Sequence, residues 1–148
     1  MARALHELGS DVTLLAMNTS KHWFDTTIQP PELGHYSAVH TVAVDNHIRP
    51  LAAVANLFSE RSYHIERFEN QDFADELAKI LQNDWFDVVQ LETLYLAPYI
   101  PMIRQRSSAL VALRTHNVEH EIWERVAANS NLLKKWYLNT ITPRLKKY

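Results

Sequence analysis

Residues 109–125, ALVALRTHNVEHEIWER, combine a strand pattern, a polar turn and a helix pattern. The run Ala109–Leu113 is wholly apolar, as in a strand that is buried on both faces of a sheet. Polar side chains then crowd positions 114–121, and apolar residues recur at helical spacing at Val118, Ile122, Trp123 and Val126. Because ligands bind at the carboxyl ends of the strands in open α/β sheets, we expect functional residues here.

The composition is that of an ordinary globular protein and narrows the classes of function. A chain of 148 residues is long enough for one domain with a core of its own. A net charge of −2 gives no electrostatic case for nucleic acid as a partner. The absence of cysteine excludes thiolate chemistry, and two glycines are too few for a glycine-rich phosphate loop. With no signal peptide or membrane-spanning run in the sequence, we expect a cytoplasmic protein.

Strand and helix patterns alternate along the chain. After a short helix that Gly9 closes in a left-handed conformation, we expect strands at residues 11–17, 38–44, 88–91 and 109–113. Helices are expected at residues 50–61, from residue 72 onward, and at residues 93–106, 118–128 and 131–148, the last broken near Pro143. This order predicts an α/β fold, a Rossmann-like parallel sheet with helices on both faces.

Three finer expectations concern the buried faces of two helices and the conformation of one connecting segment. The helix at 50–61 should bury one face, formed by Leu51, Val54, Ala55 and Phe58. The helix after residue 72 should bury Phe73, Leu77, Ile80 and Leu81. Residues 62–68 alternate in polarity, which predicts a short strand or an extended link.

Each predicted strand ends in polar residues. These are Asn18 and Thr19, Asn46 and His47, Glu92, and the group His116, Asn117 and Glu119. Because the carboxyl ends of parallel strands meet at one edge of a sheet, the four groups should lie together and form a binding site.

Metal chemistry is one interpretation of this edge. Residues 116–120 match the H-x-x-E-H pattern of inverted zinc peptidases, in which two histidines hold zinc and the glutamate is the base. That mechanism needs both imidazoles on one helix, whereas His116 is expected at the strand's end, and no third ligand is identifiable. We assign no metal site, and keep a zinc hydrolase using His116, Glu119 and His120 as an alternative.

Sugar transfer is the second interpretation, and it depends on a resemblance. The segments that resemble the N-terminal half of family 4 glycosyltransferases are residues 86–92, 95–101 and 113–119, with 4–9 and 11–15. The resemblance runs over nearly the whole chain, and the His-Asn-x-Glu segment at 116–119 is its most specific part. It implies a GT-B enzyme, in which two Rossmann-like domains face each other across a cleft and transfer sugar from a nucleotide-sugar with retention of configuration.

The resemblance also implies roles for individual residues. His116 would be the catalytic residue, close to the donor sugar, because an imidazole stabilises the charge that a leaving diphosphate accumulates. Asn117 and Glu119 would orient that imidazole or contact hydroxyl groups of a saccharide or lipid-linked acceptor. The full set of expected substrate-binding residues is Glu92, Asn117, Glu119, Asn18 and Thr19.

The chain departs from the family pattern at both ends. The first strand with its glycine-rich loop is missing, and so is the C-terminal domain that holds the nucleotide-sugar donor. Residues 1–148 are therefore expected to be a single acceptor-side domain, a fragment that is inactive alone and has no cofactor of its own. A third interpretation is a non-catalytic α/β binding module, in which His116 and Glu119 pair structurally.

The last stretch, Asn131–Tyr148, is basic and lacks acidic residues. Its cations are Lys134, Lys135, Arg144, Lys146 and Lys147, and they interleave with Leu132, Leu133, Trp136, Tyr137 and Leu138. Such a segment can hold a protein to the inner face of an anionic membrane. The alternative is a helix that packs its Leu/Trp stripe onto its own domain.

Overall fold

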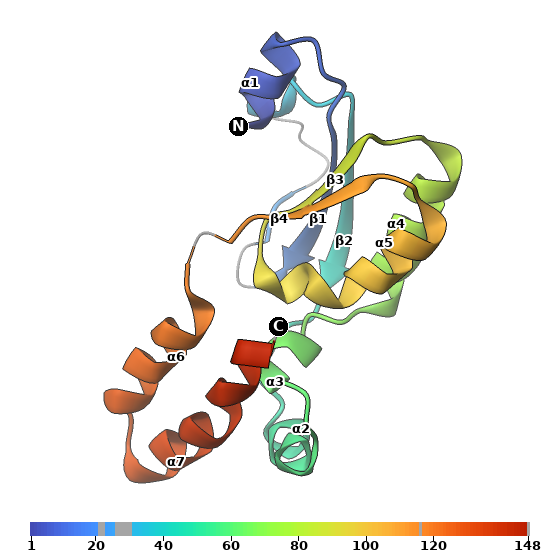
Figure 1. The fold of residues 1–148 in the computed structure, drawn as a ribbon. Helices are drawn as coiled ribbons and strands as arrows, with labels where there is room; N and C mark the ends of the chain where they lie inside the picture. The colour runs from blue at the N-terminus through green and yellow to red at the C-terminus, as the bar shows by residue number, and fades with distance from the viewer. Residues whose placement is uncertain (21–22, 26–30, 116, 148) are drawn as a thin grey trace. The chain divides into compact units, whose positions relative to one another are not determined.

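The computed structural model describes residues 1–20, 23–25, 31–115 and 117–147, and Figure 1 shows its elements. The chain divides into two compact units, Met1–Asn46 and His47–Tyr148. Both units are mixtures of helices and parallel strands, so the predicted α/β class is confirmed. The expectation of one domain over residues 1–148 stays a prediction.

The first unit is built on one parallel strand pair. Helix α1 (Ala2–Glu7) ends at Gly9, whose φ of 88° and the bond from the Ser10 N–H to the Leu5 carbonyl complete a Schellman cap. Strand β1 (Thr13–Thr19) follows and pairs with β2 (Ala38–Val44). A 3-10 turn, η2 (Pro31–Leu33), lies between the two strands along the chain. The left-handed glycine and strand β2 match the prediction, and β1 begins and ends two residues later than the predicted 11–17, so that Asn18 and Thr19 are its last two residues.

The second unit contains the other strand pair and most of the helices. Strand β3 (Val88–Leu91) pairs in parallel with β4 (Leu110–Leu113). Between them lie η4 (Leu94–Tyr99), a 3-10 helix, and α5 (Ile100–Arg106), so the helix expected at 93–106 is present in two parts. The described strands form two separate two-stranded sheets, and one sheet through both pairs stays a prediction.

Strands β3 and β4 are less buried than the sequence predicts. Leu91 is buried, but Val88 and Leu113 are exposed, and Leu110 is 69% exposed. The expectation that residues 109–113 form a strand buried on both faces is therefore wrong, because a two-stranded sheet gives these side chains too few neighbours within the unit.

Helix α4 (Gln71–Asn83) follows the prediction closely. Its N-cap Asn70 accepts a hydrogen bond from the Phe73 N–H at 2.9 Å, which satisfies a backbone donor of the first turn. The predicted apolar stripe is buried along its whole length, as Phe73, Leu77, Ile80 and Leu81.

The segment expected as a strand or link at 62–68 is instead a short helix, α3 (Tyr63–Glu66). The Ile65 and Glu66 N–H groups both donate to the Ser62 carbonyl, which closes the turn. Tyr63, His64 and Ile65 are all buried, whereas an alternating strand would have placed His64 on the opposite face from its neighbours.

Helix α2 (Pro50–Ala55) and the 3-10 turn η3 (Asn56–Phe58) bury the opposite face from the predicted one. Leu51 and Phe58 are 87% and 92% exposed, whereas Ala53 and Asn56 are buried. The prediction is wrong because polar contacts set the rotation of the helix. The Tyr137 hydroxyl donates to the Ala53 carbonyl at 3.2 Å, and a guanidinium N–H of Arg144 donates to the Asn56 carbonyl at 2.6 Å.

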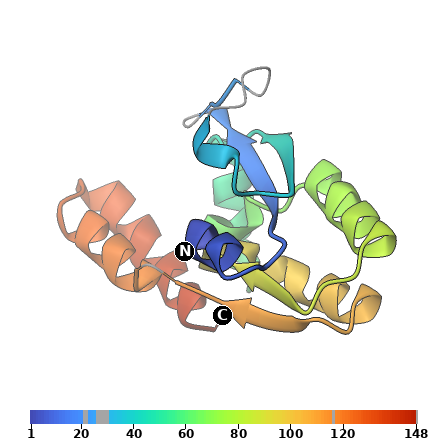
Figure 2. The same cartoon turned by 90° about the horizontal axis from the view of Figure 1, so that it is seen from above.

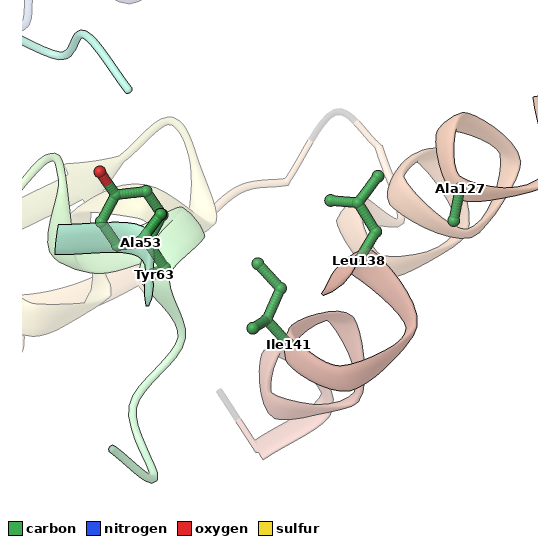
Figure 3. Packing of buried hydrophobic residues seen from close by; sticks show 5 residues of the cluster. All are labelled: Ala53, Tyr63, Ala127, Leu138 and Ile141. Atoms are coloured by element: carbon green, nitrogen blue, oxygen red, sulfur yellow. The ribbon is translucent and has the colours of Figure 1, made fainter. Parts of the chain in front are cut away.

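The C-terminal helices form an antiparallel pair. Helix α6 (Glu119–Ala128) and α7 (Leu132–Ile141) lie side by side in Figures 1 and 2, and the 3-10 segment η5 (Thr142–Lys147) follows. The predicted break near Pro143 is confirmed. Figure 3 shows the core that these helices share with α2 and α3, formed by Ala53, Tyr63, Ala127, Leu138 and Ile141.

Candidate functional site

The carboxyl ends of β1 and β2 meet, as predicted, but their polar groups are used internally. The Ser20 hydroxyl lies 3.5 Å from the Asn46 side-chain oxygen, so the two strand ends are adjacent. Asn18 is buried; its side-chain N–H donates to the Phe24 carbonyl at 2.8 Å, and its oxygen accepts from the Phe24 N–H at 2.9 Å. Thr19 is buried beside it. The Asn18 amide therefore holds the loop at Phe24. Few of its hydrogen-bonding groups are left for a substrate.

The carboxyl ends of β3 and β4 carry charged groups that reach solvent. The Arg114 N–H donates to the Leu91 carbonyl at 2.8 Å, which extends the ladder by one residue. This places the Arg114 guanidinium 3.5 Å from the Glu92 carboxylate, and each side chain is about half exposed. A Gln90 side-chain N–H also donates to Glu92. The sequence thus located Glu92 at a strand end, and the structure adds Arg114 as its partner.

Just beyond these strand ends, Tyr95 joins η4 to the first turn of α6. Its hydroxyl donates to the Glu119 carboxylate at 2.7 Å and lies 3.4 Å from the indole N–H of Trp123. Burial, followed by the hydrogen bond to Glu119, raises the pKa of Tyr95 to about 12. The phenol therefore stays protonated at neutral pH, and it serves as a hydrogen-bond donor.

Aromatic and cationic groups of α3 and the residues after it complete this cluster. The Phe68 ring stacks on Tyr95 with centroids 4.5 Å apart, and the His64 ring stacks on Trp123 at 3.9 Å. The Arg67 guanidinium lies over the Phe68 ring at 5.0 Å and 5.8 Å from the Trp123 centroid, which is cation–π geometry. The group is called the Tyr95 cluster below, and its members are His64, Arg67, Phe68, Tyr95, Glu119 and Trp123.

Two nitrogens of the Tyr95 cluster are buried without a hydrogen bond to the described residues. They are Nε2 of His64 and Nε of Arg67. Burial, with the charge of Arg67, lowers the pKa of His64 to about 4, so this imidazole is neutral at physiological pH. Unpaired buried donors and acceptors are uncommon in proteins, so these two nitrogens call for an explanation.

The chemistry of the Tyr95 cluster suits a polar ligand that also has an apolar face. A sugar ring is such a ligand, since its hydroxyl groups need charged or hydroxyl partners and its C–H faces pack on aromatic rings. Glu119, and Glu92 outside the cluster, supply acceptors, and Arg114 supplies donors, whereas the one proton of the Tyr95 hydroxyl is donated to Glu119.

The predicted catalytic residue, His116, lies outside the described residues. Its neighbour Asn117 is exposed in the turn that joins β4 to α6, and Glu119 opens α6. His120 lies in the first turn of the same helix. Within the described ranges, no group of three or more His, Cys, Asp or Glu side chains is placed to hold a metal ion.

Several residues of the Tyr95 cluster were not predicted from sequence. The apolar spacing predicts Trp123 only on the apolar face of a helix, although its spacing of four residues from Glu119 puts both on one side of α6. Arg67 and Phe68 gave no signal, because their place depends on the short helix α3, which the alternating pattern concealed.

Comparison with known proteins adds no family to this description, since no family model, curated protein or solved structure matches the chain. In the described residues, no helix is both long and apolar enough to cross a membrane. The class defined by fold and site is therefore an α/β protein with a charged and aromatic corner at the end of one parallel strand pair.

Proposed function

We propose that this chain is the acceptor-side domain of a retaining glycosyltransferase of family 4, and that the corner beside β3 and β4 binds a saccharide or lipid-linked acceptor. The observation that carries the proposal is the Tyr95–Glu119 hydrogen bond, flanked by stacked rings, next to the strand ends where Glu92 and Arg114 lie. The positions of the motifs along the chain support it, because Glu92, Tyr95, Arg114 and Glu119 of this corner all lie in segments that carry the resemblance.

In the proposed reaction, a partner domain holds the nucleotide-sugar, and this chain presents the acceptor hydroxyl. Glu92 and Glu119 accept hydrogen bonds from acceptor hydroxyl groups, and Arg114 orients the Glu92 carboxylate. His116 stabilises the leaving diphosphate. The proposal includes a Rossmann-like sheet through all four strands, which would bring Asn18 and Thr19 to the same edge.

Equilibrium binding of saccharides to this chain tests the proposal. A panel of mono- and oligosaccharides should include at least one that binds wild type, and Tyr95→Phe should weaken that binding about tenfold, because it removes the hydroxyl that positions the Glu119 carboxylate. Tyr36→Phe is a matched control, because Tyr36 belongs to the other unit. A panel in which nothing binds, or equal losses in both variants, would contradict the proposal.

One observation bears on the alternatives. The Glu119 carboxylate already accepts a hydrogen bond from Tyr95, which favours a positioning or binding role over that of a metallopeptidase base. A non-catalytic binding module remains the second candidate, since Arg67 and Glu119 both make internal contacts. His116→Ala in an enzyme containing this chain separates the two, because loss of rate with retained folding requires a catalytic role.

A further inference from the structure

The Arg67 side chain ends among the aromatic rings of the Tyr95 cluster. Arg67 follows the last residue of α3, and its backbone keeps the helical conformation, with φ −67° and ψ −10°. Its guanidinium carbon lies over the Phe68 ring, 5.0 Å from the centroid, and 5.8 Å from the centroid of Trp123. The side chain as a whole is half-buried. The cation is therefore held against aromatic surface rather than surrounded by water.

No carboxylate among the described residues forms an ion pair with Arg67. Arg61 and Arg114 of the same unit, by contrast, both pair with glutamates. The carboxylate of the cluster itself, Glu119, accepts a hydrogen bond from the Tyr95 hydroxyl instead. A half-buried cation without a counter-ion has a desolvation cost, which a bound anion would offset.

The nitrogen atoms of Arg67 divide between the interior of the cluster and solvent. Nε is buried and has no hydrogen bond to the described residues. The two terminal nitrogens also have no partner in the described ranges, but they are not buried, so they reach solvent. Two N–H groups of one guanidinium edge match two oxygens of a phosphate or a carboxylate. The side chain can therefore bind either group through two parallel hydrogen bonds.

We propose that Arg67 binds an anionic group of the ligand, and that the acceptor is an anionic saccharide, one that carries a phosphate or a carboxylate. This inference rests on the proposed function, because it names the substrate class of the same corner. Arg114 already pairs with Glu92, so the charge of Arg67 is the one that a ligand neutralises. The Phe68 ring orients the guanidinium, and Glu119 accepts a hydrogen bond from a sugar hydroxyl.

Titration of the full chain with sodium phosphate tests the anion site without any sugar. The indole N–H signal of Trp123 in NMR spectra should shift with phosphate, and sodium chloride at the same ionic strength should not shift it. Arg67→Gln should weaken phosphate binding about tenfold, because the charge and both donors are lost. Arg67→Lys, which keeps the charge but not the fork of donors, should weaken it severalfold. Arg104→Gln is the matched control, because Arg104 is exposed on α5 and its loss changes the net charge equally.

Matched sugars then decide whether the anion belongs to the acceptor. The panel consists of glucose, glucose 6-phosphate and glucuronate, with the corresponding forms of galactose and mannose. At least one anionic sugar should bind wild type about tenfold more tightly than its neutral parent. Arg67→Gln should remove this advantage and leave the affinity for the neutral parent within about twofold. The tighter of the two anionic forms identifies the group as phosphate or carboxylate.

The outcomes separate this inference from the proposed function. Neutral sugars that bind as tightly as their anionic forms would overturn the inference and leave the proposed function standing. Phosphate binding that is equally strong in Arg67→Gln and Arg104→Gln would also overturn the inference. Phosphate bound at Arg67, with no sugar of the panel bound, would support the anion site and overturn the proposed function. Circular dichroism checks the fold of each variant, and if Arg67→Gln does not fold, Arg67→Lys takes its place.

Discussion

The two parallel strand pairs both end in polar side chains, but they use them differently. At the end of β1, Asn18 is buried and its amide is taken up by the backbone of Phe24. At the ends of β3 and β4, Glu92 and Arg114 are charged and half exposed, beside the Tyr95–Glu119 pair. A polar residue at a strand end is therefore a stronger candidate for binding where its side chain reaches solvent than where it is buried against the backbone of its own unit.

The largest expected effect is that of low pH, which should lower the stability of the unit containing His64 more than that of the unit containing Asn18. The folded-state pKa of His64 is about 4, below its ordinary value of 6.5, so folding favours the neutral imidazole. This contribution to stability is complete above pH 6.5 and is lost as the pH falls from 6.5 towards 4, by about 3 kcal/mol. Urea unfolding of wild type and His64→Phe at pH 7 and pH 4 measures it, since phenylalanine keeps a ring against Trp123 but does not titrate.

The expected result is that wild type loses more stability than His64→Phe between these two pH values. Equal losses would mean that His64 is not held neutral by burial. Hydrogen exchange should show the acid loss in the second unit, which contains His64, Arg67 and Trp123.

Asn18→Ala should have the next largest effect. It removes both side-chain hydrogen bonds to Phe24, which should lower the free energy of unfolding by about 2 kcal/mol. Asn46→Ala is the control, because its contact with Ser20 is exposed and long, and it should cost less than about 0.5 kcal/mol. Similar losses in the two variants, measured by urea unfolding, would contradict the assignment of Asn18 to the scaffold.

Tyr95→Phe should lower stability by about 1 kcal/mol, because one hydrogen bond to a partly exposed carboxylate is lost while the ring stack with Phe68 is kept. Thermal unfolding measures this loss. A variant as stable as wild type would indicate that the Tyr95 hydroxyl contributes nothing to the fold.

Glu92→Gln should have the smallest effect on folding. Its ion pair with Arg114 is half exposed, and such pairs contribute less than about 1 kcal/mol. Stability should therefore change by no more than about 0.5 kcal/mol, while saccharide affinity should fall severalfold. A large loss of stability would place Glu92 with Asn18, as a residue of the scaffold.

The sequence predicted those parts of the fold that depend on local pattern. The buried stripe of α4, the left-handed Gly9 and the break before Pro143 all follow from periodicity or backbone preference. Glu92 at the end of β3 and Glu119 at the start of α6 were likewise placed by where apolar runs stop.

The rest depended on contacts between distant residues. Tyr137 holds the backbone of α2 and Arg144 that of η3, and this turns Leu51 and Phe58 outward despite their apolar spacing. The Tyr95 cluster likewise unites side chains from α3, η4 and α6. A short sequence pattern cannot predict which side chains three separate elements bring together.

The most direct test of the binding site is an amide NMR titration of the chain with a saccharide that binds it. The account predicts shifts of the Glu92, Tyr95 and Glu119 amide signals, with Asn18 and Thr19 shifting less. Shifts confined to Asn18 and Thr19, or an unchanged spectrum at Tyr95 and Glu119, would contradict it.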